Sequence, residues 1–113
     1  MEIHINIAMV DVKVKMNDLQ LNERETKILE VLLLNMCAQT NAQVTKGGMA
    51  LNPLRKTEES NIFHQQLAWQ QSITSEQYEQ MKEGLSRRIT NAIKMCELPE
   101  VEIDYKENAY LNI

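Results

Sequence analysis

The first 16 residues alternate between apolar and polar positions, with one interruption. Isoleucines occupy every second position over 3–7, and after Ala8-Met9 the alternation resumes with Val10, Val12, Val14 and Met16. A period of two with β-branched residues is typical of strands that cover a core with one face. We therefore expect two strands here, and a short third strand over 19–21 after the Asn17-Asp18 turn.

A helical spacing replaces the alternation after residue 21. The Asn22 side chain can cap the first free backbone donors of a helix, and Glu25 stands three residues later, as in a capping box. Apolar residues then recur at helical spacing from Ile28 to Met36. This pattern predicts a helix over 23–36.

The stretch from 37 to 56 is expected to be an irregular insertion. Gly47-Gly48 and Asn52-Pro53 interrupt any regular element there. Thr57 can then cap a second helix over 58–70. The side chains expected to face inward from this helix are Ile62, Phe63, Leu67 and Trp69.

The longest predicted helix covers 75–96. Thr74 and Gln77 form another potential capping box, and Pro99 ends the pattern. One apolar stripe runs along this helix at steps of three and four residues. Its members are Tyr78, Met81, Leu85, Ile89, Ala92 and Cys96.

The last segment is expected to form a hairpin. Residues 101–105 alternate, 106–108 can turn, and 109–113 alternate again. The whole chain, 1–113, therefore predicts a single α+β domain. Its parts are an N-terminal antiparallel sheet (1–21), a three-helix core with an irregular insertion (22–98) and a C-terminal β-hairpin (100–113).

This order of elements, and three motifs within it, resemble the OmpR/PhoB-type winged-helix DNA-binding domain and its ToxR-like relatives. Leu21-Asn22-Glu23-Arg24-Glu25 is similar to that family's Leu-Thr-x-x-Glu helix start. The segment from Leu85 to Ala92 resembles its recognition helix, and the segment from Asp104 to Tyr110 resembles its closing wing. The chain departs from the family in its long 37–56 connection, in Glu107 and Ala109 where the wing has glycines, and in lacking a receiver domain.

The resemblance implies a winged helix-turn-helix fold and a bacterial transcription regulator that reads double-stranded DNA. The helix over 75–96 would enter the major groove with its apolar stripe turned inward. Arg87, Thr90, Asn91 and Lys94 would then lie on the outward side, where Arg and Asn can bond base edges and Lys94, like Lys82 and Lys106, can contact phosphates. The remaining expected DNA contacts are Lys82, Ser86, Arg88 and Lys106.

The charge balance weighs against this reading overall but supports it locally. The net charge is −4, whereas phosphate neutralisation requires Lys and Arg. Within 82–94, four basic residues accompany a single acid, Glu83. Acids surround the predicted hairpin, where Lys106 is the lone base among 100–107.

A second function therefore stays open: a winged-helix-like protein–protein interaction module, such as an adaptor or a secretion-associated chaperone, that does not bind DNA. The net charge, Glu107 and the 37–56 insertion favour it. The resemblance further implies binding to repeated sites and contact with RNA polymerase through 70–75. Exposed strand edges near the N-terminus could pair two copies into a homodimer.

Catalytic and cofactor chemistry find no sequence support. The chain has no phosphate-binding glycine loop, metalloprotease helix or nucleophile elbow, so we expect no enzyme and no small-molecule substrate. Cys37 and Cys96 lie far apart, and His4 and His64 lack partners at metal-ligand spacing, so we expect no metal, no cofactor and reduced thiols. These features favour a cytoplasmic protein, or the cytoplasmic face of the inner membrane if the chain is a fragment of a ToxR-like regulator.

Overall fold

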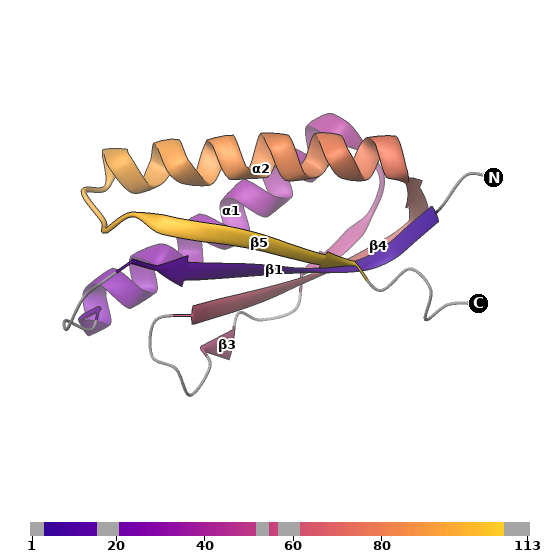
Figure 1. The fold of residues 1–113 in the computed structure, drawn as a ribbon. Coiled ribbons are helices and arrows are strands. Elements are labelled where there is room, and N and C mark those ends of the chain that lie inside the picture. The colour runs from indigo at the N-terminus through magenta and orange to yellow at the C-terminus, as the bar shows by residue number, and fades with distance from the viewer. Residues whose placement is uncertain (1–3, 16–20, 52–54, 57–61, 108–113) are drawn as a thin grey trace.

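The computed structural model describes residues 4–15, 21–51, 55–56 and 62–107. The described residues form a sheet and two helices that lie together on one of its faces (Figure 1). In chain order the elements are β1 (His4–Val14), α1 (Glu23–Val44), β2 (Met49–Leu51), β3 (Arg55–Lys56), β4 (Ile62–Thr74), α2 (Ser75–Met95) and β5 (Val101–Glu107). The α+β class with an antiparallel sheet is confirmed.

The strand order in the sheet is β2-β4-β1-β5, with β3 also paired to β4. All these pairings are antiparallel. Each helix therefore connects two strands that run in the same direction and are separated by a third strand, the arrangement called a split β-α-β. Over 8–13, β1 pairs with β4 on one side and with β5 on the other, so the prediction that strand edges near the N-terminus could pair two copies is wrong for this part of the strand.

The N-terminal segment is one strand, not the two that were expected. The register between β1 and β4 shifts between Ile5 and Ile7, which marks an irregularity of the β-bulge type. Ile5 is buried before the shift, and Ala8 and Val10 are buried after it, whereas Ile7 is half-buried. The interruption in the alternation therefore marks the point within one strand where the buried residues change from odd-numbered to even-numbered positions. Of the expected third strand, only Leu21 is described, and it is buried outside any strand.

Helix α1 begins where the sequence predicts and ends eight residues later. Asn22 Oδ1 accepts a hydrogen bond from the Glu25 backbone, and Glu25 Oε1 accepts one from Asn22, so the capping box is confirmed. No glycine or proline interrupts 37–44, and Cys37 continues the buried face of the helix. Much of the expected irregular insertion is therefore helix, followed by short strands before and after 52–54.

The expected second helix over 58–70 is wrong from residue 62 onward, where the chain forms strand β4; residues 57–61 lie outside the described residues. Phe63, Leu67 and Trp69 are buried, as predicted, but they alternate with half-buried residues in the manner of a strand. Gln65 occupies the remaining inward position and is fully buried. This polar residue on the core face hid the period of two.

Helix α2 follows its prediction closely. Thr74 Oγ1 accepts from the Gln77 backbone and Gln77 Oε1 accepts from Thr74, which confirms the second capping box. The predicted stripe faces the core from Tyr78 to Ile89. Cys96, at the C-cap, is exposed instead.

The C-terminal segment pairs with β1 over 101–107. The expected turn at 106–108 is therefore wrong at Lys106 and Glu107, which continue strand β5. Residues 108–113, the second half of the expected wing, lie outside the described residues. The described part of the chain contains two helices, and the three-helix core is wrong.

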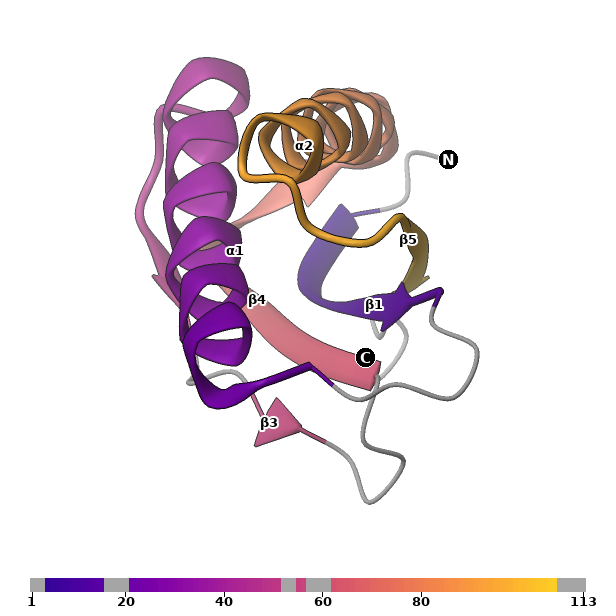
Figure 2. The ribbon, with the colours of Figure 1, turned by 90° about the vertical axis from the view of Figure 1, so that its left-hand side faces the viewer.

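The two helices approach each other closely at Gly84. A Cβ atom at this position would lie 3.2 Å from Cγ2 of Thr40 on α1 and 2.9 Å from Nη1 of Arg88. Gly84 therefore permits the contact, although glycine costs a helix up to about 1 kcal/mol relative to alanine. The end-on view shows α1 and α2 side by side over the sheet (Figure 2).

Candidate functional site

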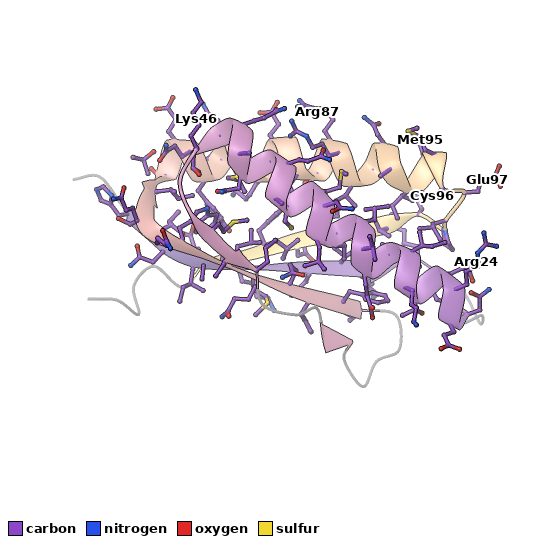
Figure 3. All side chains as sticks on the ribbon, turned by 180° about the vertical axis from the view of Figure 1, so that it is seen from behind. Arg24, Lys46, Arg87, Met95, Cys96 and Glu97 are labelled. Carbon is purple, nitrogen blue, oxygen red and sulfur yellow. The ribbon has the colours of Figure 1, made fainter. Side chains whose placement is uncertain are left out.

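The outer face of α2 carries the residues predicted to read DNA. Its buried side chains include Leu85, Ile89 and Ile93, which pack toward the sheet and α1. At 3.6 residues per turn, the opposite side of the helix then faces away from the core. Arg87, Thr90, Asn91 and Lys94 are all exposed on that side, and Figure 3 shows Arg87 turned away from the sheet.

Three other residues predicted to contact DNA already form contacts with other side chains of the protein. Arg88 donates to Thr40 Oγ1 at 3.3 Å and to Gln43 Oε1, so its guanidinium joins α2 to α1. The Ser86 hydroxyl and the Tyr105 hydroxyl lie 2.7 Å apart and share a hydrogen bond. Lys82 pairs with Glu79 at 2.8 Å and also lies over the Tyr78 ring.

Lys106, the predicted wing contact, lies away from the α2 surface. It is in β5, and its ammonium group is 3.2 Å from Oδ2 of Asp11 on β1. Asp11 also hydrogen-bonds to Nδ1 of His64 on β4. In the register of the sheet, Asp11 lies opposite His64 and its neighbours Val10 and Val12 point into the core, so this cluster is on the face away from the helices. The structure therefore does not bring Lys106 together with Arg87 and Lys94.

A stripe of six exposed residues runs along α2 directly opposite its buried side. The spacing is four, three, four, three and four residues, which returns to the same side of the helix at every step. The members of this outer stripe are Glu76, Gln80, Glu83, Arg87, Thr90 and Lys94. Its first half is acidic and its second half is basic.

Sequence reasoning missed the acidic half of this stripe. It identified Arg87, Thr90 and Lys94 by their position opposite the apolar residues, but did not extend the same count toward the N-terminus. Glu76 and Glu83 occupy equivalent positions on the first turns of α2. The helical period of the sequence therefore already predicted these two positions. They were missed because a DNA recognition helix was expected, and only basic and polar residues were considered as contacts.

A buried polar cluster connects the C-terminal end of α1 to the sheet. Asn41, which is 6% exposed, accepts hydrogen bonds at Oδ1 from Trp69 Nε1 at 2.8 Å and from the Thr45 hydroxyl at 2.7 Å. Its Nδ2 donates to the Gly47 carbonyl at 2.8 Å. Because each polar atom of the Asn41 side chain has a partner, the cluster orders the turn after α1 and is a structural site.

Three buried or half-buried groups have raised pKa values. Burial raises the pKa of the Cys37 thiol to about 12, so this thiol stays protonated and unreactive at neutral pH. Burial also raises the pKa of Tyr105 to about 12, although its hydrogen bond to Ser86 acts in the opposite direction. For Tyr78, burial is again the main cause, and its pKa is about 12. None of these groups lies on the outer stripe.

Neither a metal centre nor a membrane-crossing helix is found in the part of the chain that the structure describes. No group of three or more histidine, cysteine, aspartate or glutamate side chains lies close enough to hold a metal ion there. Within the same residues, neither helix is long and apolar enough to cross a membrane.

Comparison with known proteins identifies the fold but no family. No family model matches the chain, and no curated protein matches it in sequence. Among solved structures it is similar to a hydantoinase/carbamoylase family amidase from Burkholderia ambifaria, with a TM-score of 0.57 and 7% identity. That match covers 93% of this chain but 27% of the amidase, so the chain spans only about a quarter of that protein's length.

A second similar structure is a de novo designed protein with a ferredoxin fold. The TM-score is 0.55 at 12% identity, and the match covers 92% of this chain and 86% of the designed protein. At such identities the likeness concerns the fold alone. The strand order and the two matches together show that the chain has the ferredoxin fold.

Proposed function

We propose that this chain is a protein–protein interaction module that docks through the outer stripe of α2. The observation that carries the proposal is the equal number of acids and bases on that stripe, with Glu76 and Glu83 in one half and Arg87 and Lys94 in the other. Such a surface matches a protein surface that also carries both signs of charge. A duplex would instead place phosphates against both acids.

The way the other cationic residues are engaged supports this choice over DNA. Phosphate binding gains most of its free energy when several Lys and Arg residues reach the backbone together. Arg88 and Lys82 are held by contacts within the protein, and Lys106 lies on the opposite face of the sheet. Arg87 and Lys94 alone would neutralise few phosphates.

The expected interaction is reversible and sensitive to salt. Exposed ion pairs contribute about 0–1 kcal/mol each, and they are screened over about 8–10 Å at physiological ionic strength. A partner held mainly by the stripe therefore dissociates readily as the salt concentration rises. The charges act chiefly on the choice and orientation of the partner.

A site-specific photocrosslinker tests the proposal. Thr90, exposed in the middle of the basic half, is replaced by a benzophenone amino acid in cells that express the chain, and Lys13 on the uncovered sheet face is replaced as the matched control. We expect a protease-sensitive adduct at position 90 and none at position 13. Equal protein adducts at both positions would contradict the assignment to α2.

DNA binding through α2 is a second candidate function. The observation in its favour is that Arg87, Thr90, Asn91 and Lys94 share one accessible helix face. If α2 reads bases, Arg87→Ala and Asn91→Ala each cost about 1–3 kcal/mol and relax base preference, whereas Lys94→Ala weakens all sequences alike. A nuclease-sensitive adduct at position 90 would support this candidate, and no duplex binding at about 50 mM salt would reject it.

A further inference from the structure

We propose that the partner of the outer stripe is a second copy of this chain, bound with the two α2 helices antiparallel across a two-fold axis. This inference rests on the proposed function, because both use the same stripe. The order of charges carries it: reading the stripe backwards exchanges every acid for a base. A two-fold interface requires this kind of self-complementary surface.

One antiparallel register satisfies all the charges at once. It places Glu76 opposite Lys94 of the second copy and Glu83 opposite Arg87 of the second copy. The uncharged Gln80 and Thr90 then meet each other. Because of the two-fold axis, each of these pairs occurs twice.

Other registers pair fewer charges or oppose like charges. A shift of the helices by two turns leaves only Glu83 with Lys94, or only Glu76 with Arg87. A shift by one turn places Arg87 against Arg87 or Glu83 against Glu83, which is unfavourable. Parallel helices related by a two-fold axis would oppose like charges at all four charged positions. The sequence of the stripe thus selects one orientation and one register.

The fold leaves this side of α2 accessible to another helix. α1 lies beside α2, and the sheet lies on the buried side of both helices, as the end-on view in Figure 2 shows. The six stripe residues are all exposed and stand opposite Leu85 and Ile89, which are fully buried. A second α2 can therefore approach along the stripe without displacing a core contact of the first.

The dimer is expected to be weak and to depend on ionic strength, because its central row is polar. Coiled-coil seams owe their stability mainly to apolar residues at such spacing, and charged positions set the partner and orientation. We therefore expect association at low salt and high protein concentration. Raising the salt from about 20 mM to about 500 mM should dissociate it, since screening shortens to a few ångströms.

Exchange of charges between copies provides the decisive test. Glu83→Arg and Arg87→Glu each place like charges across the two-fold axis, and each is expected to weaken self-association by about tenfold or more in sedimentation equilibrium. Mixing the two variants places arginine opposite glutamate at every such contact. The heterodimer should therefore form with about the same affinity as the wild-type dimer. The double variant E83R/R87E should also recover self-association.

Matched controls carry the same changes of charge elsewhere. Glu102 and Lys13 lie on the exposed side of the sheet. The variants Glu102→Arg and Lys13→Glu should keep the self-association constant within about twofold of the wild type. Circular dichroism confirms that each variant is folded. Rescue by mixing cannot arise from a loss of folding in either variant.

The outcomes separate this inference from the proposed function. A wild-type chain that stays monomeric at about 1 mM protein and low salt overturns the dimer, as does an unchanged dimer in Glu83→Arg. If the chain is monomeric but position 90 still crosslinks to a different protein, only the inference fails. If position 90 forms no protein adduct at all, both fail.

Discussion

The two helices are nearly equal in length and cover the same face of the sheet, yet they use their polar residues differently. α1 has 22 residues and α2 has 21, and both begin with a complete capping box. α1 turns a polar side chain, Asn41, into the core, where it holds Trp69 and the following turn. α2 carries an outer stripe of exposed residues whose first half is acidic and whose second half is basic.

This difference shows that two helices on the same face of one sheet can differ in how their polar residues are used. Packing on the sheet demands much the same of either helix, namely one apolar side. The sides of the helices that do not pack on the sheet can differ in their polar residues. In α1 the charges fall in the first turns and neutral amides follow, whereas in α2 charges recur along the whole length. Substitutions in the two helices test this difference through their effects on the free energy of unfolding.

The largest loss of stability is expected from truncating a buried leucine, and the loss should be equal in both helices. Leu33 in α1 and Leu85 in α2 are fully buried, and truncating either to alanine should cost about 2–5 kcal/mol through lost burial and a residual cavity. Urea unfolding measures the cost. A difference of more than about 2 kcal/mol between the two variants would show that the helices are not equivalent in the core.

Asn41→Ala should be the next most costly change and has no counterpart in α2. It leaves the Trp69 indole N–H and the Gly47 carbonyl without their partner, which costs about 1–3 kcal/mol for a buried donor alone. Asn35→Ala, at an exposed position of the same helix, is the control and should change stability by less than about 0.5 kcal/mol in urea unfolding. Equal effects of the two variants would remove the structural role assigned to Asn41.

Tyr105→Phe tests the attachment of α2 to the sheet. The Tyr105 hydroxyl bonds to Ser86 and donates to the Lys82 carbonyl at 3.1 Å, and its loss should cost about 1 kcal/mol at pH 8. Burial raises the pKa of Tyr105 above its ordinary value of 10.0 to about 12. Its stabilising contribution is therefore complete below pH 10 and is lost as the pH rises through about 12.

Urea unfolding at pH 8 and at about pH 11.5 checks this sign. The difference in stability between wild type and Tyr105→Phe should shrink at the higher pH. A difference that grows with pH would mean that the folded protein favours the ionised phenol. Ser86→Ala serves as a companion variant, because it removes one of the two partners and leaves the phenol in place.

Gly84→Ala probes the crossing of the two helices. Helix propensity alone would stabilise the variant by up to about 1 kcal/mol, but the new Cβ would lie 3.2 Å from Cγ2 of Thr40. We expect the steric cost to prevail by about 1 kcal/mol. In a Thr40→Ser background, which removes that methyl group and keeps the hydroxyl, Gly84→Ala should be stabilising. The same sign in both backgrounds would exclude Thr40 as the cause.

The smallest effects are expected on the outer stripe. Thr90→Ala and Lys94→Ala should each change stability by less than about 0.5 kcal/mol, since neither side chain has a packing role. Ile93→Ala, one residue away and 3% exposed, should cost several times more. A large loss at Thr90 or Lys94 would show that the outer face is structural rather than free for binding.

Local signals in the sequence predicted much of the fold. Both capping boxes, the start of α1, nearly all of α2 and the inward side of α2 follow from side chains within a few residues of one another. The error at β4 had a tertiary cause. Gln65 is tolerated on the core face, and this buried polar residue obscured the alternation that marks a strand. With β4 read as a helix, the order of elements resembled a winged helix.

The candidate site was predicted in part. Arg87, Thr90, Asn91 and Lys94 lie exposed on one side of α2, as expected. Arg88 and Ser86 could not be assigned from sequence, because their partners, Thr40 and Tyr105, are distant in the chain. Lys106 was misplaced for the same reason: strand β5 pairs with β1, which puts its ammonium group beside Asp11.

The sequence by itself determined where both helices begin, where α2 ends, the apolar side of each helix and the order of charges along α2, because capping and helical periodicity act over one or two turns. Only the tertiary structure decided that the 62–74 segment is a strand and which polar side chains remain free. Those outcomes depend on pairing and packing between residues far apart in the chain. The outer stripe depends on both levels. The sequence determines the order of its charges, and the packing of α2 on the sheet determines that these side chains are exposed.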